Sequence, residues 1–204
     1  NLMPVTINGD GSITGLSVGG LGSGVVNTAT LADGAASGSK LTMPSGSVIQ
    51  TVQSVKTGID SYSTGSSTLS DSYFDISGLS VSITPSSGTK CLVSYTVNVG
   101  GQAGYGQGLA LFRDSTQIYL ADASGNIQRL SNFDYTVDNK KVDSMSGQFL
   151  DTHGANGSTA VTYKLQMYVA EPGWTTRVNR SQSTASDRDY GRGASSITVM
   201  EIAG

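Results

Sequence analysis

The chain has 204 residues and a net charge of −3, and its 13% of charged residues is about half the share usual in soluble domains. This balance argues against nucleic acid as the main partner, because phosphate binding needs a basic surface. No apolar run approaches the roughly 18 to 20 residues that span a bilayer, so we expect no membrane insertion, and no export signal is recognised. The single cysteine, Cys91, excludes an intrachain disulfide framework and is typical of synthesis in a reducing cytoplasm.

Residues 1–45 differ in composition from the rest of the chain. Residues 1–42 contain no aromatic side chain, and single aliphatic residues are spread among Gly, Ser, Ala and Thr. Burial of large side chains, at about 25 cal/mol per Å², must offset about 1 to 2 kcal/mol of backbone entropy per residue. A segment without such side chains either stays flexible or finds its core between chains. We interpret 1–45 as an attachment or stem segment.

From residue 46 onward the sequence alternates between apolar and polar residues, with turn residues between the runs. This period of two is typical of half-buried antiparallel strands. A first strand is predicted at 47–56, a second at 79–83 before Pro85, and a third at 91–99. Segments 109–113 and 117–120 are predicted to form a hairpin about Asp114 and Ser115.

The clearest alternation lies at 161–169. We expect this strand to pair with 174–180, reached through the turn Glu171-Pro172-Gly173, and a last strand is predicted at 195–202. No stretch has helical periodicity. About eight short strands therefore predict an all-β fold, with residues 46–204 forming an antiparallel β-sandwich or jelly-roll head domain.

The sequence lacks convincing motifs for catalysis and metal binding. The only histidine, His153, lies in a polar turn without the Gly-x-Ser-x-Gly elbow of a nucleophilic serine, so we expect an exposed turn residue. One His and one Cys cannot supply the ligands of structural zinc, and Asn8-Gly9-Asp10-Gly11-Ser12 contains one carboxylate, which favours a tight turn over a calcium loop. Glycan hydrolysis by paired carboxylates is disfavoured because the chain has no long β-helix repeat. We expect no catalytic residue, metal or cofactor.

Two clusters favour ligand contact. Tyr105 lies within the glycine-rich segment 100–108, which is predicted to be a loop tip. The second cluster is rich in aromatic and basic side chains: Trp174, Arg177, Arg180, Arg188, Tyr190 and Arg192. Aromatic faces and guanidinium groups bind sugar rings and anionic substituents. The alternative is that Trp174 and Arg180 pack a subunit interface.

Several phrases of the sequence resemble those of a known family. They are INGDGSITGL (7–16), GVVNTATLADGA (24–35), GSVIQTVQ (46–53), SGLSVSITP (77–85), VNRS (178–181) and ASSITVMEI (194–202). These phrases are similar to those of tail-fibre-like structural proteins of marine and cyanobacterial tailed phages. The middle of the chain, roughly 100–157, is similar only in the general character of its sequence. The resemblance implies a homotrimeric virion protein whose N-terminal part attaches to other virion proteins and whose β domain is displayed outward.

The sequence therefore predicts a phage fibre or spike protein that mediates adhesion to a glycan or protein of the host surface. The receptor-binding candidates are Tyr105, Trp174, Arg177, Arg188, Tyr190 and Arg192. One alternative is a head-fibre or capsid-decoration protein without a dedicated receptor. Another is a free-standing carbohydrate-binding module.

Overall fold

The computed structural model describes residues 6–7, 9, 13–14, 43–65, 73–183 and 188–204. The chain divides into two compact units, Asn1–Met43 and Pro44–Gly204. In the first unit, β1 (Thr6–Ile7) pairs antiparallel with β2 (Ile13–Thr14), with Ile7 opposite Ile13. These strands flank the expected tight turn at 8–12, of which only Gly9 belongs to the described residues. The attachment role of 1–45 stays a prediction.

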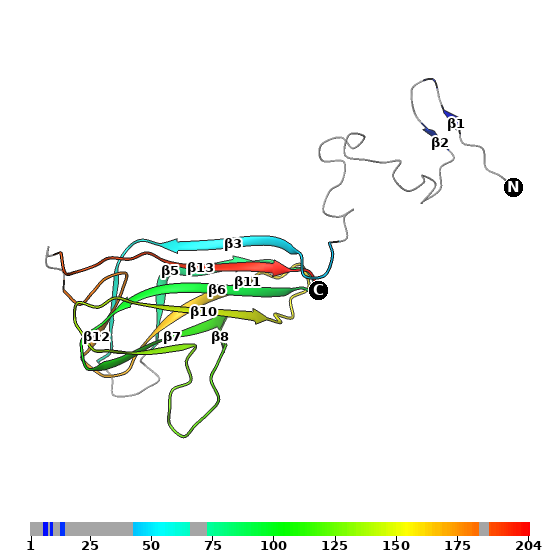
Figure 1. Ribbon diagram of the computed structural model, residues 1–204. Coiled ribbons are helices and arrows are strands. Elements are labelled where there is room, and N and C mark those ends of the chain that lie inside the picture. The colour runs from blue at the N-terminus through cyan, green and yellow to red at the C-terminus, as the bar shows by residue number, and fades with distance from the viewer. Residues whose placement is uncertain (1–5, 8, 10–12, 15–42, 66–72, 184–187) are drawn as a thin grey trace. The chain divides into compact units, whose positions relative to one another are not determined.

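The second unit is a β-sandwich of two antiparallel sheets (Figure 1). The first sheet has six strands, which are β3 (Val48–Lys56), β13 (Ser195–Ile202), β6 (Lys90–Gly100), β12 (Thr175–Val178), β4 (Asp60–Ser63) and β10 (Asp143–Asp151). The second sheet has five strands, which are β5 (Tyr73–Ile83), β11 (Val161–Val169), β7 (Tyr105–Arg113), β8 (Thr116–Ile118) and β9 (Asn132–Thr136). The described residues include no helix. The predicted all-β sandwich is confirmed.

The core lies between the inner faces of the two sheets. Successive residues of a strand point to opposite faces, so the alternating apolar positions of one strand share one side. Odd-numbered residues are buried on β6 and its neighbour β13 in the first sheet and on β11 in the second: Cys91, Val93, Tyr95, Val97, Val99, Ile197, Val199, Tyr163, Leu165 and Met167. Burial of this shared face is what holds the sheets together.

The predicted hairpin about Asp114 is confirmed, because β7 pairs with β8 and Arg113 lies opposite Thr116. The predicted pairing of 161–169 with 174–180 is wrong. A strand has only two edges, and β5 and β7 occupy both edges of β11. The chain therefore crosses to the other sheet after Val169, where β12 pairs with β4 and β6.

The sandwich has two distinct ends. At one end the backbone N–H of Gly46 donates to the carbonyl of Ala203 at 2.9 Å, so the start and the finish of this unit lie together (Figure 1). From there β6 runs for 11 residues to Gly100, a length of about 35 Å. We call the end that carries Gly100, Tyr105 and Val169 the distal end. It lies opposite the end where Ala203 meets Gly46.

Candidate functional site

An aromatic pair lies at the distal end. The rings of Tyr105 and Trp174 stack with their centroids 3.6 Å apart and their planes 20° apart, and both side chains are half-buried. Tyr105 is the first residue of β7, and Trp174 precedes β12 directly. The Gly173 N–H donates to the Thr64 carbonyl at 2.7 Å, which holds the turn before Trp174 in place. We call Tyr105 and Trp174 the aromatic platform, because aromatic rings suit the apolar faces of sugars.

The loops around the platform are joined by hydrogen bonds. The Asn139 side-chain oxygen accepts from the Ala103 N–H at 2.8 Å. The Asn139 carbonyl accepts from the Gln182 N–H at 3.0 Å. The Tyr135 hydroxyl donates to the Gly104 carbonyl at 2.6 Å. Three segments that are far apart in sequence, 101–104, 135–139 and 180–182, therefore form one continuous surface.

Arg177 lies on β12, opposite Gly100 of β6, and is half-buried. One terminal nitrogen, Nη1, donates to the Thr175 carbonyl at 3.2 Å and to the side-chain oxygen of Gln182. Its Nε is buried and has no hydrogen-bond partner. Burial, together with the positive charge of Arg180, lowers the pKa of Arg177. The guanidinium nevertheless stays protonated at neutral pH.

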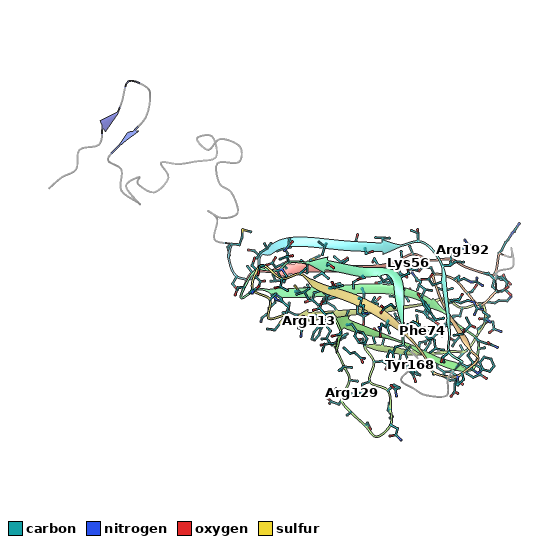
Figure 2. The ribbon with its side chains drawn as sticks, turned by 180° about the vertical axis from the view of Figure 1, so that it is seen from behind. Lys56, Phe74, Arg113, Arg129, Tyr168 and Arg192 are labelled. Carbon is teal, nitrogen blue, oxygen red and sulfur yellow. The ribbon has the colours of Figure 1, made fainter. Side chains whose placement is uncertain are left out.

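The neighbouring Arg180 is also half-buried. Arg180 donates from Nε to the Ser181 carbonyl at 3.1 Å and from Nη2 to the Gln182 carbonyl at 3.0 Å. Its backbone forms an isolated bridge with Arg192, which is exposed, as is Arg188. Arg192 lies three residues before Ser195, which pairs with Lys56, the last residue of β3, and Figure 2 shows Arg192 well away from Arg113.

Tyr190 is half-buried beside a lysine. The Lys140 ammonium lies 5.8 Å from the centre of the Tyr190 ring and forms a 2.6 Å ion pair with Asp189. Lys140 belongs to the loop between β9 and β10, so this contact joins that loop to the C-terminal segment. Cation–π contacts at exposed positions contribute about 0.5 to 1 kcal/mol each.

The structure thus brings together several of the residues singled out from sequence. Tyr105 meets Trp174, and the backbone of Arg180 pairs with that of Arg192. Their role in receptor binding stays a prediction. Sequence reasoning did not single out Asn139, Ser181 or Gln182. Asn139 and Gln182 join the loops, Gln182 also contacts Arg177, and Ser181 is buried. No motif marks them, since their contacts depend on how separate loops meet.

The expectation of an exposed turn histidine at 153 is wrong. His153 is half-buried. Its Nδ1 accepts from the Ala155 N–H at 2.9 Å, and its Nε2 lies 3.3 Å from the Thr89 hydroxyl. That hydroxyl also donates to the carboxylate of Glu201 at 2.9 Å. These three side chains form a polar network near Ala203, at the end of the sandwich opposite the platform.

Two features are absent from the part of the chain that the structure describes. No group of three or more His, Cys, Asp or Glu side chains in this part of the chain is arranged to hold a metal ion. Within the same residues, no helix is long and apolar enough to cross a membrane.

No protein-family model and no curated protein matches the chain. Among solved structures, a chain from the structure of the infectious bursal disease virus Gt strain is similar, with a TM-score of 0.40 and 11% sequence identity. The alignment covers 77% of this chain and 43% of that chain. This protein therefore spans less than half the length of the chain that it matches.

Proposed function

We propose that the protein is a virion surface protein, a phage fibre or spike whose β-sandwich head binds the host surface. The observation that carries this proposal is the placement of the aromatic platform. Tyr105 and Trp174 lie at the distal end, and the chain enters and leaves the sandwich at the other end. A head attached through its N-terminal side therefore presents the platform outward. Binding residues commonly lie on loops that a rigid scaffold holds in this way.

The binding that we propose is weak for one head and strong for several. A platform of two rings contacts one or two sugar units, which gives modest affinity by itself. Linked heads raise the effective concentration for each further contact, so a homotrimer binds far more tightly than one chain. In this proposal residues 1–45 attach the trimer to other virion proteins. Adhesion of this kind needs no catalytic residue and no cofactor.

Adsorption to host cells and binding to a glycan panel test the proposal. We expect Trp174→Ala in the full chain to reduce adsorption by at least about tenfold, because loss of a binding aromatic typically costs 2 kcal/mol or more. Tyr119→Ala is the matched control. Tyr119 stacks on Phe149 with ring centroids 5.3 Å apart, and it lies outside the distal end. Wild-type adsorption by a correctly folded Trp174→Ala protein would contradict the proposal.

One observation favours a second candidate, a head-fibre or capsid-decoration protein. The outer face of β6, β10 and β13 carries mainly uncharged side chains, some of which bond to one another, as Thr96 does to Ser146 at 2.9 Å and Gln148 does to Ser94 at 3.1 Å. The cores of protein interfaces are depleted of charge, so such a face suits packing against neighbouring subunits. Electron microscopy of intact particles would separate this structural role from adhesion by locating the protein on the virion.

A further inference from the structure

Two strands, β3 and β10, form opposite edges of the first sheet (Figure 1). Among the described strands, β3 pairs only with β13, and β10 pairs only with β6. Each of the two edge strands has nine residues. An edge strand presents a row of backbone N–H and C=O groups that can pair with a strand of another chain.

The edge at β10 is open to such pairing. The Ser146 carbonyl accepts from the Asn132 side chain at 3.1 Å, so this carbonyl points away from β6. Backbone groups of alternate residues point the same way, which places those of Ser144, Gln148 and Leu150 at this edge too. All four of these residues are exposed. Within the described part of the chain, 144–150 has no other backbone hydrogen bond outside the ladder with β6.

The edge at β3 is open on its outer side. This strand contacts β5 through an inward side chain, because the Ser54 hydroxyl donates to the Gly78 carbonyl at 2.7 Å. The alternate residues of β3 point outward and are all exposed: Ile49, Thr51, Gln53 and Val55. The contact with β5 therefore leaves the outer side of the strand uncovered.

Neither edge carries the features that usually keep edge strands apart, which are lysines, prolines and β-bulges. Residues 144–150 and 48–55 include no charged residue and no proline. The pairing of β10 with β6 runs from Asp143 to Asp151 without a register shift. The carboxylates at these two ends each form an ion pair within the chain, at 2.8 Å. Two long uncharged edges of this kind favour pairing with another strand.

Strand direction allows the two edges to pair with each other between copies. Neighbouring strands in the row β3, β13, β6, β10 are antiparallel, so β3 and β10 run in opposite directions. Rotation about an axis along the strands therefore brings β10 of one copy antiparallel to β3 of the next. Val55, Ser196, Thr96 and Ser146 form one row across the sheet. The register that continues this row places Val55 of the next copy opposite Ser146.

This register also matches the apolar side chains at the two edges. Three positions further along each strand, it places Val52 opposite Phe149. Both side chains are half-buried and pack against the core of their own sandwich, at opposite edges of the first sheet. On the outer face the register places Gln53 opposite Gln148, and two amides can hydrogen-bond to each other. Pairing in this register therefore covers the remaining surface of Val52 and Phe149.

We propose that β10 of one copy pairs with β3 of the next copy, so that the first sheets of neighbouring subunits join edge to edge. The contact uses two different surfaces of the chain, and a contact of this type closes into a ring when the rotation closes. It rests on the homotrimer of the proposed function and names the surfaces through which the heads meet.

Disulfide trapping in the full chain tests this pairing. The variant carries Gln53→Cys and Gln148→Cys, two exposed positions at which replacement should preserve the fold. Within one chain, β13 and β6 separate these positions by three strand spacings, about 14 Å. A disulfide spans Cα atoms no more than about 7 Å apart, so it can join these cysteines only between chains. The native Cys91 is 0% exposed and does not compete.

We expect oxidised glutathione to convert the double variant into covalent dimers and trimers on non-reducing gels. The matched control combines Gln53→Cys with Thr116→Cys, an exposed position on β8 of the second sheet, and should stay unlinked. Covalent dimers of Gln148→Cys alone would mean that β10 pairs with β10, which would overturn the proposal.

A proline variant gives a second, independent measure. The Ser146 N–H points away from β6, so Ser146→Pro in the double-cysteine variant removes no bond of the sheet and should leave the head folded. Loss of one intermolecular hydrogen bond should lower the yield of covalent trimer about fivefold. Circular dichroism checks the fold, and an unchanged yield from the folded protein would refute the pairing.

Light scattering separates this proposal from the proposed function. A trimer of the double-cysteine variant that forms no covalent link would refute the edge pairing and leave the homotrimer standing. A monomer would refute both. Covalent trimers together with normal adsorption by Trp174→Ala would support the edge pairing and refute the role of the aromatic platform.

Discussion

The carboxylate of Glu201 accepts a hydrogen bond from the Thr89 hydroxyl at 2.9 Å, although Glu201 is 0% exposed. It also accepts from the Ser86 N–H at 2.7 Å and from the Gln50 side chain at 2.6 Å. Burial alone would raise the pKa of Glu201, but these donors outweigh burial and hold its pKa below the usual range. A buried carboxylate therefore ties β13 to β3 and to the turn before β6.

The first prediction concerns acid stability. Because the folded-state pKa of Glu201 is lowered, its contribution is complete above the unfolded-state pKa of about 4.3 and is lost as the pH falls through the folded value. Glu201→Gln should lower the free energy of unfolding at neutral pH by about 1 to 3 kcal/mol. It should also flatten the loss of stability below about pH 4. Urea unfolding at neutral and acid pH checks both, with Asp122→Asn in an exposed loop as control.

A second prediction concerns the ion pair of Arg113 and Asp151. The Arg113 Nη1 lies 2.8 Å and 2.9 Å from the two carboxylate oxygens, and the Tyr163 hydroxyl donates to the same carboxylate at 2.7 Å. Asp151 is 6% exposed and Arg113 is 25% exposed. Arg113→Ala should cost about 2 to 3 kcal/mol, less than for a fully buried pair, because Arg113 is partly exposed and its removal lets water reach the carboxylate.

Denaturant unfolding of Arg113→Ala measures that cost. Arg129→Ala, which removes an exposed arginine, should change stability by no more than about 0.5 kcal/mol. Adding Asp151→Asn to Arg113→Ala should recover part of the loss, since no unpaired buried charge then remains. Equal stability of the two single-arginine variants would show that the ion pair contributes nothing.

The sequence predicted strands well where every inward position is apolar, as in β6 and β11. It missed β10, because the residues of β10 that point inward are Asp143, Met145, Gly147, Phe149 and Asp151. Gly147 is needed at its position, since a Cβ there would lie 2.4 Å from the Tyr95 hydroxyl oxygen. The Tyr95 ring fills the space that a β10 side chain would otherwise occupy. The sequence of β10 alone cannot show that Tyr95 of the neighbouring strand β6 supplies the side-chain volume that Gly147 lacks.

The sequence identified the residue types of the candidate site but not how their side chains are arranged. Tyr105 and Trp174 stand out in the sequence as aromatic residues near turns, yet nothing local predicts that their rings stack. Arg177 was expected to contact a receptor directly. Its partial burial follows from the segment 180–182, which lies on Gly100, and that contact joins residues from two separate parts of the chain.

The third prediction concerns His153. From the sequence an exposed histidine was expected, with a change of about 0.5 kcal/mol or less on replacement by alanine. Its bonds to Ala155 and Thr89 now lead us to expect that His153→Ala lowers the free energy of unfolding by about 1 kcal/mol. Cell adsorption should not change, because His153 lies at the end opposite the platform. Thermal unfolding and adsorption assays check the two parts separately, and unchanged stability would restore the original expectation.

The last prediction concerns assembly and the role of residues 1–42. We expect light scattering on the full chain to give three times the 20.9 kDa chain mass, because a segment so poor in large apolar groups gains a core only between chains. A stable monomer would contradict the homotrimer. Deletion of residues 1–42 should leave the sandwich folded, with a free energy of unfolding per chain within about 0.5 kcal/mol of the same sandwich in the full protein.

Backbone hydrogen bonds at the start of the sandwich explain why the protein without residues 1–42 should stay folded. The sandwich closes on itself at this end, since Gly46 N–H donates to Ala203 at 2.9 Å and Ala203 N–H donates to Ser47 at 2.8 Å. From Val48 onward β3 pairs with β13, so these backbone bonds join residues that the truncated protein keeps. Circular dichroism and urea unfolding measure the result, and incorporation of the truncated protein into virions should be abolished. Aggregation or unfolding of the truncated protein would mean that residues 1–42 contribute to the core of the head.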